Sequence, residues 1–371
     1  MKIAIVGTAY PYRGGIAAFN ERLAHEFQRE GHEVDVYTFT LQYPKFLFPG
    51  KTQYSEGPAP EGLHIVRCIH STNPLSWSKA GKMIGDQHYD LVLFAYWMSF
   101  FAPCYCAIAR QLKGTKRIAL VHNMFPHEKT LLDRLFAPRF VKSMDGFVAL
   151  SQSVVRDVES LDKRQKPKAW SPHPIYDHYG PREPREVALE RLGLSGDYRY
   201  MLFFGLVRAY KGLDLLIKAF SDDRLRKYPL RLLVVGEFYD DKKPYLEEIQ
   251  SYGLSKMIVI RDEFIPDDQV KDYFNAADIV VQPYKSATQS GVTQVAYHFE
   301  KPMLVTNVGG LEEIVPHGQV GYAVSPDAHS IAEALVDFFS NNRKETFESN
   351  LRTEKDKYSW EKLTKVILDL E

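Results

Sequence analysis

Residues 198–220 read YRYMLFFGLVRAYKGLDLLIKAF, and this stretch decides the fold class. A run of large apolar residues, Tyr200–Phe204, stops at Gly205, which is typical of a buried strand followed by a turn. After Gly212 the apolar residues recur at the spacing of a helix with one buried face. A buried strand that leads through a short loop into an amphipathic helix is the repeating unit of a parallel α/β sheet.

Two cations, Arg208 and Lys211, lie in the loop between this strand and this helix. Ligands of open parallel sheets bind beyond the carboxyl ends of the strands, so we expect the two cations to meet a ligand. They would suit a diphosphate, whose negative charge grows as it leaves. The alternative is that both are ordinary solvated surface charges.

Length and composition predict two domains in a chain of 371 residues. Lysine plus arginine and aspartate plus glutamate number 47 each, so the net charge does not indicate a nucleic-acid partner. The three cysteines, Cys68, Cys104 and Cys106, form neither a disulfide framework nor a zinc-binding spacing. We therefore expect a reducing, cytoplasmic setting. The apolar start of the chain, residues 1–7, is too short for a signal peptide.

The segment from Leu91 to Ala109 carries no charge over 19 residues and approaches the length of a membrane span. Ser99 and Pro103 interrupt it. We interpret it as a buried strand, Leu91–Tyr96, followed by a packed helix that Pro103 helps to start.

The first half of the chain alternates short apolar runs with helical patterns. The turn Arg13-Gly14-Gly15 lies where the first strand meets a helix over residues 16–30. The full dinucleotide fingerprint is absent, so NAD is not predicted. Gly14 and Gly15 either let backbone amides approach an anion or simply form a tight turn. The predicted strands are Lys2–Val6, Glu33–Thr38, Leu63–Cys68, Asp90–Tyr96, Arg117–Val121 and Gly146–Leu150.

His122 follows the fifth predicted strand, where chemistry is favoured over a merely structural role. Residues 40–62 form a long loop with aromatic residues and lysines, which suits an acceptor-binding or membrane-touching lip. Between Arg110 and Lys142 there are eight lysines and arginines but only two acids. This run faces either anionic lipid headgroups or plain solvent.

Residues 171–187 hold four prolines and resemble an interdomain linker. We predict a first domain over 1–175, a linker over 176–197 and a second domain over 198–357, with a terminal helix over 358–371 that packs on the first domain. The strands expected in the second half are Tyr200–Phe204, Arg231–Val235, Met257–Ile260, Ile279–Gln282 and Pro302–Thr306.

A loop of small polar residues, 285–292, leads into a helix predicted over Thr293–Phe299. Free amides at a helix start after Ser290-Gly291 make a cradle for an anion, although a plain capped helix would have the same sequence. Gly236 ends a second strand at the same sheet edge as Gly205, and Ile265 precedes a helix that begins at Asp267.

The order of these motifs resembles the retaining glycosyltransferases of the GT-B type, group 1 or family 4-like. The resemblance is carried by Gly14-Gly15, His122-Asn123, the segment 205–212, and Gly309-Gly310-Leu311-Glu312-Glu313. It implies an α/β fold of two Rossmann-like domains with an interdomain cleft. The second domain would hold the nucleotide-sugar and the first the acceptor.

The resemblance also implies the site residues. The catalytic set is His122, Arg208 and Lys211; the donor-binding set is Gly14, Gly15, Gly205, Gly236, Ile265, Gln289, Ser290, Gly291, Val292 and Gln294. The sequence departs from the family where two glutamates usually bracket the small-residue loop. Ala287 or Thr288 and Val295 occupy those places, and Gln294 is the stand-in for the glutamate that binds ribose.

We expect a retaining glycosyltransferase that moves a sugar from a nucleotide-diphosphate sugar to a glycan or lipid-linked acceptor in bacterial surface polysaccharide synthesis. It would work in the cytoplasm, either free or at the inner face of the membrane. No Asp-x-Asp pair occurs, so we expect neither a metal nor another cofactor. The alternatives are a GT-B-shaped sugar-nucleotide epimerase and a two-domain sugar-binding protein without chemistry.

Overall fold

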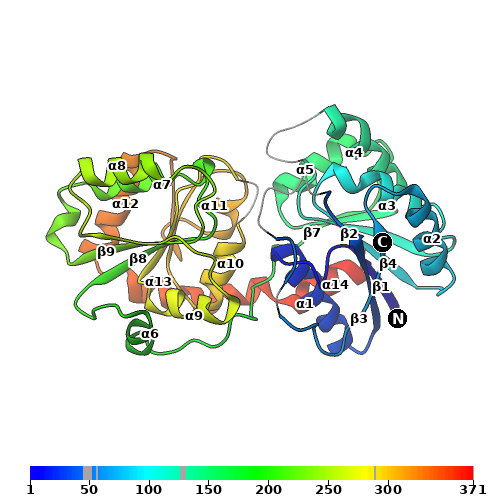
Figure 1. Cartoon of the computed structure of the whole chain (residues 1–371), viewed down its shortest axis with the longest axis horizontal. Helices are drawn as coiled ribbons and strands as arrows, with labels where there is room; N and C mark the ends of the chain where they lie inside the picture. The colour runs from blue at the N-terminus through cyan, green and yellow to red at the C-terminus, as the bar shows by residue number, and fades with distance from the viewer. Residues whose placement is uncertain (45–51, 56, 126–130, 288–289, 371) are drawn as a thin grey trace. The chain divides into compact units, whose positions relative to one another are not determined.

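The computed structural model describes residues 1–44, 52–55, 57–125, 131–287 and 290–370. The chain folds into two compact units (Figure 1). Unit 1 comprises Met1–His173 together with Trp360–Glu371, and unit 2 comprises Pro174–Ser359. Each unit is a parallel sheet whose strands alternate along the chain with helices.

Unit 1 contains a seven-stranded sheet in the order β3-β2-β1-β4-β5-β6-β7, and its strands pair in parallel. This is the Rossmann order: β1, β2 and β3 are added towards one edge of the sheet, and β4 to β7 are added towards the other edge. The point between β1 and β4, where the order of addition reverses, is the reversal point of the sheet. The bounds are β1 Lys2–Val6, β2 Glu33–Leu41, β3 His64–His70, β4 Leu91–Tyr96, β5 Lys116–Val121, β6 Gly146–Ala149 and β7 Lys168–Trp170. Six of these were predicted. The short edge strand β7 was missed because its three residues, Lys-Ala-Trp, form no apolar run.

The helices of unit 1 bury their apolar faces against this sheet. They are α1 Gly15–Arg29, α2 Pro74–Gly85, α3 Ala102–Ala109, α4 Leu131–Ser143, α5 Gln152–Leu161 and α14 Trp360–Leu368. The uncharged segment folds as predicted, since β4 is buried throughout and a short 3-10 turn leads into α3, which has Pro103 in its first turn. No helix within the described ranges is both long and apolar enough to span a membrane.

The carboxyl-terminal helix α14 packs on α1 in unit 1, which confirms that expectation (Figure 1). The ring of Trp360 lies 4.9 Å from that of Phe19, and the guanidinium of Arg22 lies over Trp360 at 5.1 Å. The last element of the chain therefore completes the first sheet's helical layer.

Unit 2 contains a six-stranded sheet in the order β10-β9-β8-β11-β12-β13, again the Rossmann order. Here the reversal falls between β8 and β11. The bounds are β8 Arg199–Phe204, β9 Leu230–Val235, β10 Ile258–Arg261, β11 Ile279–Gln282, β12 Met303–Thr306 and β13 Gly321–Val324. The sequence predicted all of these except β13. That strand starts at Gly321, which interrupts the apolar pattern. Only glycine fits at this position, because a Cβ there would lie 1.9 Å from the carbonyl oxygen of Met303.

The segment predicted as a linker over 176–197 is partly helical. Helix α6, Arg185–Leu192, packs on α9, and Arg191 forms an ion pair of 2.9 Å with Asp272. The prolines thus mark only the irregular first half of this segment, and the whole of 176–197 belongs to unit 2. The other helices of unit 2 are α7 Leu213–Phe220, α8 Lys243–Ser251, α9 Asp267–Ala276, α10 Gly291–His298, α11 Leu311–Ile314, α12 Ala328–Ser340 and α13 Lys344–Glu354.

Candidate functional site

Lys211 is the centre of the candidate site in unit 2. It follows β8 at the reversal point of the sheet, and only 9% of its surface is exposed. Its ammonium lies 5.6 Å from the centroid of the Tyr284 ring. Burial lowers its pKa, and the nearby charge of Arg208 adds to that effect. No carboxylate in the described part of the chain pairs with this ammonium. A buried cation without a counterion is a ready partner for an anion.

Gly205 forms the wall opposite this ammonium. A Cβ at position 205 would lie 3.0 Å from Nζ of Lys211 and 4.0 Å from a methyl group of Val292. Gly205 has a φ of +96°, which also favours glycine. The glycine therefore leaves room for the lysine ammonium beside the first turn of α10.

The loops after β8 and β11 are held together through the main chain. Gly212, at φ +69°, could carry no side chain, because its Cβ would lie 2.0 Å from the carbonyl oxygen of Pro283. The amide of Lys285 donates to the carbonyl of Tyr210 at 2.7 Å. These two loops border the reversal point, where ligands of Rossmann-like sheets bind.

The first turn of α10 supplies backbone amides to the same region. Ser290 caps the helix, since its hydroxyl accepts the amide of Val292 at 3.3 Å and donates to Oε1 of Gln282. The structure thus contains the capped helix that the sequence allowed. Gly291 lies against the ring of Tyr176, because a Cβ on Gly291 would be 3.1 Å from Cε2 of Tyr176. Gln289 lies outside the described residues.

Two buried glutamines near this helix start have unused hydrogen-bonding atoms. Gln294 is fully buried, and both its Oε1 and its Nε2 lack a partner in the described structure. Nε2 of Gln282 is likewise buried without a partner there. Each such group costs about 1–3 kcal/mol unless something else satisfies it. The sequence pointed to Gln294 but missed Gln282, although Gln282 ends β11 at the same sheet edge.

Gly236 and Arg208 extend the site along this edge. A Cβ on Gly236 would lie 2.3 Å from the carbonyl oxygen of Gly205, so the loops after β8 and β9 touch. The guanidinium of Arg208 lies 4.0 Å above the ring of Tyr239. Ile265 is buried after β10, but no described contact joins it to the other residues of the site.

His122 in unit 1 follows β5 and is buried. Its ring packs edge-on against Phe19 at 4.8 Å, and His173 contacts the same phenyl ring at 4.8 Å. Burial and the neighbouring His173 lower the pKa of His122 to about 3, so the imidazole is neutral near pH 7. Its Nε2 is buried without a partner in the described structure. His173 was missed because it lies in the proline-rich segment.

The turn Gly14-Gly15 opens α1 in unit 1. Gly14 has a φ of +117°, the helix has no side-chain cap, and a Cβ at Gly14 would meet nothing within 4 Å. Nearby, the carboxylate of Glu21 accepts the amide of Tyr10 at 2.6 Å. Burial raises the pKa of Glu21 to about 7. No sequence motif pointed to Glu21.

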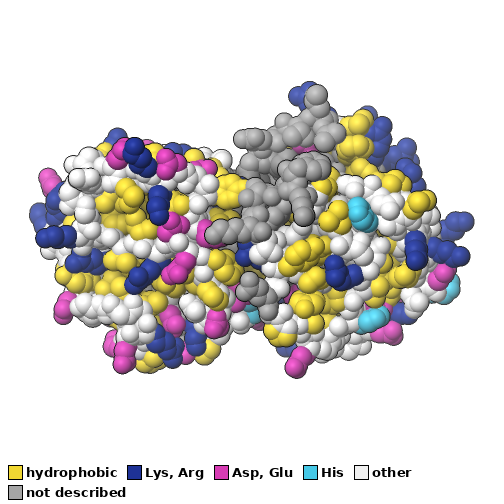
Figure 2. Space-filling model, viewed as in Figure 1, with side chains coloured by type: hydrophobic (Ala, Val, Ile, Leu, Met, Phe, Trp, Pro, Cys, Tyr) yellow, Lys and Arg dark blue, Asp and Glu magenta, His cyan; other side chains and the backbone are white. Residues whose placement is uncertain are grey.

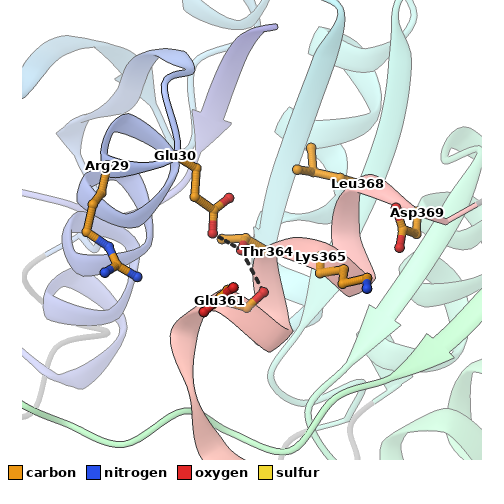
Figure 3. Close-up of a pocket in the computed structure, with 7 residues that line it drawn as sticks. All are labelled: Arg29, Glu30, Glu361, Thr364, Lys365, Leu368 and Asp369. Atoms are coloured by element: carbon orange, nitrogen blue, oxygen red, sulfur yellow. Dashed lines mark hydrogen bonds between the residues drawn. The ribbon is translucent and has the colours of Figure 1, made fainter.

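A hollow of about 420 Å³ lies at the carboxyl end of α1 (Figure 3). The length of α1 separates it from Gly14 and Gly15 by about 20 Å. Charges of both signs surround it, and the hydroxyl of Thr364 lies within hydrogen-bond distance of Glu30 and of the carbonyl of Glu361. Its lining is Arg29, Glu30, Glu361, Thr364, Lys365, Leu368 and Asp369. This hollow contains none of the predicted site residues and marks where α14 packs on α1. Within the described ranges no cluster of three or more histidine, cysteine or acidic side chains could hold a metal ion.

Comparison with known protein families assigns both units. The model described as "Glycosyl transferases group 1" matches residues 198–341, and the model described as "Glycosyltransferase Family 4" matches residues 13–172.

Curated relatives extend over nearly the whole chain. An uncharacterized glycosyltransferase of Methanocaldococcus jannaschii is 26% identical and covers 98% of this chain and 96% of its own. D-inositol 3-phosphate glycosyltransferase of Streptomyces avermitilis is 27% identical, and the match covers 88% of this chain and 75% of that protein. O-antigen chain mannosyltransferase C of Escherichia coli is 24% identical, and the match covers 90% of this chain and 87% of that protein.

Among solved structures, Anabaena HepE in complex with UDP matches with a TM-score of 0.76 at 15% identity, over 100% of this chain and 99% of its own. At that identity the likeness concerns the fold. Together with the two Rossmann-ordered sheets, these matches show that the chain belongs to the group 1 glycosyltransferases and has their GT-B fold.

Proposed function

We propose that this glycosyltransferase moves a sugar from a nucleotide-diphosphate sugar to its acceptor with retention of the anomeric configuration and without a metal ion. The observation that carries the proposal is the buried ammonium of Lys211, which faces Gly205 and the start of α10 without a carboxylate partner in the described structure. A diphosphate would supply the missing negative charge. The UDP bound to the structural relative HepE is a ligand of this class.

The chemistry needs stabilisation of the departing diphosphate. Lys211, Arg208 and the amides of residues 290–292 would meet the charge that develops as the bond between the anomeric carbon and the phosphate oxygen breaks. The acceptor hydroxyl would attack the same face of the sugar, and its proton would pass to the leaving phosphate oxygen. This same-face transfer requires no protein nucleophile and no metal-bound group.

Gln294 would bind the ribose. Its amide offers both a donor and an acceptor, and ribose hydroxyls can use both. The unpartnered atoms of Gln294 support this assignment, because a bound nucleotide would remove the cost of leaving them unsatisfied. Gly14 and Gly15 would help to bind the donor, and His122 would belong to the catalytic set, as the resemblance implies. Since the pKa of His122 is low, it would act as a neutral hydrogen-bonding group near the sugar and not as a strong base.

The acceptor would be a glycan or a lipid-linked glycan, met in the cytoplasm at the inner membrane face during surface polysaccharide synthesis. The relative named as an O-antigen chain mannosyltransferase supports this class of acceptor. A face of unit 1 also supports it: the α3–α4 face, which consists of Arg110, Lys113, Arg134, Leu135, Phe136, Arg139 and Lys142. Figure 2 shows basic and hydrophobic side chains side by side over these helices.

The charges on the α3–α4 face suit an anionic membrane. Its five cations are exposed, and 48% of the Leu135 surface is exposed as well. The described residues of α3 and α4 carry no exposed acid, because Asp133 is buried. A hollow of about 190 Å³ between the helices is lined by Arg110, Arg139 and apolar side chains.

The proposal is tested by incubating the protein with UDP-, GDP- and ADP-sugars and measuring release of the nucleoside diphosphate with and without acceptors. We expect release that rises with an acceptor and a glycoside with the donor's anomeric configuration, read from NMR coupling constants. An inverted product would overturn retention. Formation of an epimeric nucleotide-sugar would favour the epimerase, and binding without turnover of any donor would favour the sugar-binding protein.

A further inference from the structure

The ring of Tyr239 lies against the guanidinium of Arg208, with 4.0 Å between Cζ and the ring centroid. We infer that Tyr239 is a positioning residue that holds Arg208 ready for the diphosphate. The inference rests on the proposed function, because it takes Arg208 as a ligand of that group. It goes further by assigning a role to a side chain on the loop after β9, which the sequence motifs do not include.

The main chain holds these two residues side by side. The amide of Val207 donates to the carbonyl of Glu237 at 2.8 Å, and the amide of Tyr239 donates back to the carbonyl of Val207 at 3.0 Å. On the other side of Arg208, the amide of Ala209 donates to the carboxylate of Asp240 at 2.9 Å. The contact between the side chains therefore follows from a backbone pairing that a change of either side chain would leave in place.

A ring can orient a guanidinium without using up its charge. No carboxylate in the described ranges forms an ion pair with Arg208. An aspartate or glutamate partner would orient the group but would also occupy its N–H donors and offset its charge. An aromatic face contacts the flat side of the guanidinium and leaves the in-plane donors available. Tyr239 thus orients a cation whose charge and donors remain free for an anion.

The same unit contains a matched contact with no ligand assigned to it. The guanidinium of Arg231 lies 4.1 Å from the ring centroid of Tyr198. Tyr198 immediately precedes β8 and Arg231 is the second residue of β9, so this pair lies at the amino ends of the strands whose carboxyl ends lead to Arg208 and Tyr239. Tyr198→Leu is therefore a control for loss of an arginine–tyrosine contact as such.

The test measures the affinity for UDP and GDP by calorimetry, and then kcat with the donor that the screen identifies. An exposed cation–π contact corresponds to an effect of about two- to fivefold. We expect Tyr239→Leu to weaken nucleotide binding and lower kcat by about this factor, and Tyr239→Phe and Tyr239→Trp to recover most of the loss. Tyr198→Leu should match the wild type. In an Arg208→Ala background, Tyr239→Leu should have no further effect.

The outcomes separate this inference from the proposed function. If Arg208→Ala is impaired while Tyr239→Leu matches the wild type, the positioning role is wrong and the diphosphate assignment stands. A loss from Tyr239→Leu that persists undiminished in the Arg208→Ala background would also overturn it, since Tyr239 would then act on the donor itself. If Arg208→Ala keeps both affinity and turnover, the proposed role of Arg208 fails.

Discussion

The ammonium of Lys211 lies 5.6 Å from the centroid of the Tyr284 ring, and the two residues come from loops on opposite sides of the reversal point of the second sheet. The Tyr284 hydroxyl is itself within 3.2 Å of the Ser290 hydroxyl that caps α10. The cation, the ring and the helix start thus form one continuous group. Burial has already removed much of the water that would otherwise solvate the ammonium, which strengthens its interaction with an incoming anion.

The first prediction concerns the two cations. Lys211→Ala and Arg208→Ala should each lower kcat by on the order of a hundredfold or more, because each removes a group that meets charge in the transition state. Steady-state kinetics with the identified donor measures this effect. Lys218→Ala is the control, since Lys218 is an exposed lysine on the adjacent helix α7. Near wild-type turnover in the Lys211 or Arg208 variant would refute the diphosphate assignment.

The second prediction concerns metal ions. Treatment with EDTA should leave kcat largely unchanged, because Arg208, Lys211 and helix amides are proposed to stabilise the leaving diphosphate. The measurement compares initial rates before and after chelation, and again after magnesium or manganese is added back. Loss of turnover that either metal restores would contradict a metal-independent reaction.

Much of the fold was predictable because the central strands of both sheets are continuous apolar runs. Strand β4, for example, is buried at every position, and the sequence predicted it within one residue. The missed strands, β7 and β13, are short edge strands with no such run. Their pairing depends on neighbours already in place, which a local pattern does not reveal.

The residues of the candidate site that the sequence predicted come from the strand–loop–helix pattern or, for Gln294, from the family resemblance. Lys211 and Arg208 are examples, since the strand–loop–helix pattern alone places them at the sheet edge. His173 and Tyr239 belong to the neighbourhood of His122 and Arg208 through contacts between segments far apart in the sequence. The sequence pattern contains no distance between such segments, so it could not bring them together.

The third prediction concerns Gln294, whose buried amide has no described partner. Gln294→Met should leave the free protein at least as stable as the wild type, because an apolar side chain of similar size removes an unsatisfied polar group. It should also reduce the rise in melting temperature that UDP or GDP produces. Thermal denaturation with and without each nucleotide measures both effects. A variant that is strongly destabilised but keeps the full nucleotide shift would contradict the ribose assignment.

The fourth prediction uses the pKa of His122, which burial lowers to about 3. Below about pH 6.5 the unfolded imidazole binds a proton that the folded one excludes, so this residue reduces the free energy of unfolding by up to about 1.4 kcal/mol per pH unit as the pH falls towards 3. Glu21, with a pKa raised to about 7, acts in the opposite direction between about pH 4.5 and 7. The prediction therefore concerns the difference between a variant and the wild type.

His122→Gln should show a smaller loss of stability than the wild type as the pH falls from 6.5 to 4. Urea denaturation at several pH values gives the two slopes. His329→Gln is the control, because the side chain of His329 is 81% exposed. Parallel pH profiles for His122→Gln and the wild type would mean that the pKa of His122 is the same in the folded and the unfolded protein, which would contradict the prediction.

The last prediction concerns the α3–α4 face and the membrane. Each cation near an anionic bilayer contributes about 1 kcal/mol, so Arg110→Gln combined with Arg139→Gln should weaken binding to phosphatidylglycerol vesicles by about 2 kcal/mol, roughly thirtyfold. Co-sedimentation measures this, and wild-type binding should disappear at high salt and on neutral phosphatidylcholine vesicles. The control, Lys243→Gln with Lys256→Gln, removes two exposed cations from unit 2 and should bind as the wild type does. If the wild type fails to bind anionic vesicles at low salt, the membrane contact is refuted. If the two double variants weaken binding equally, the attraction is a property of net charge and the α3–α4 face has no special part in it.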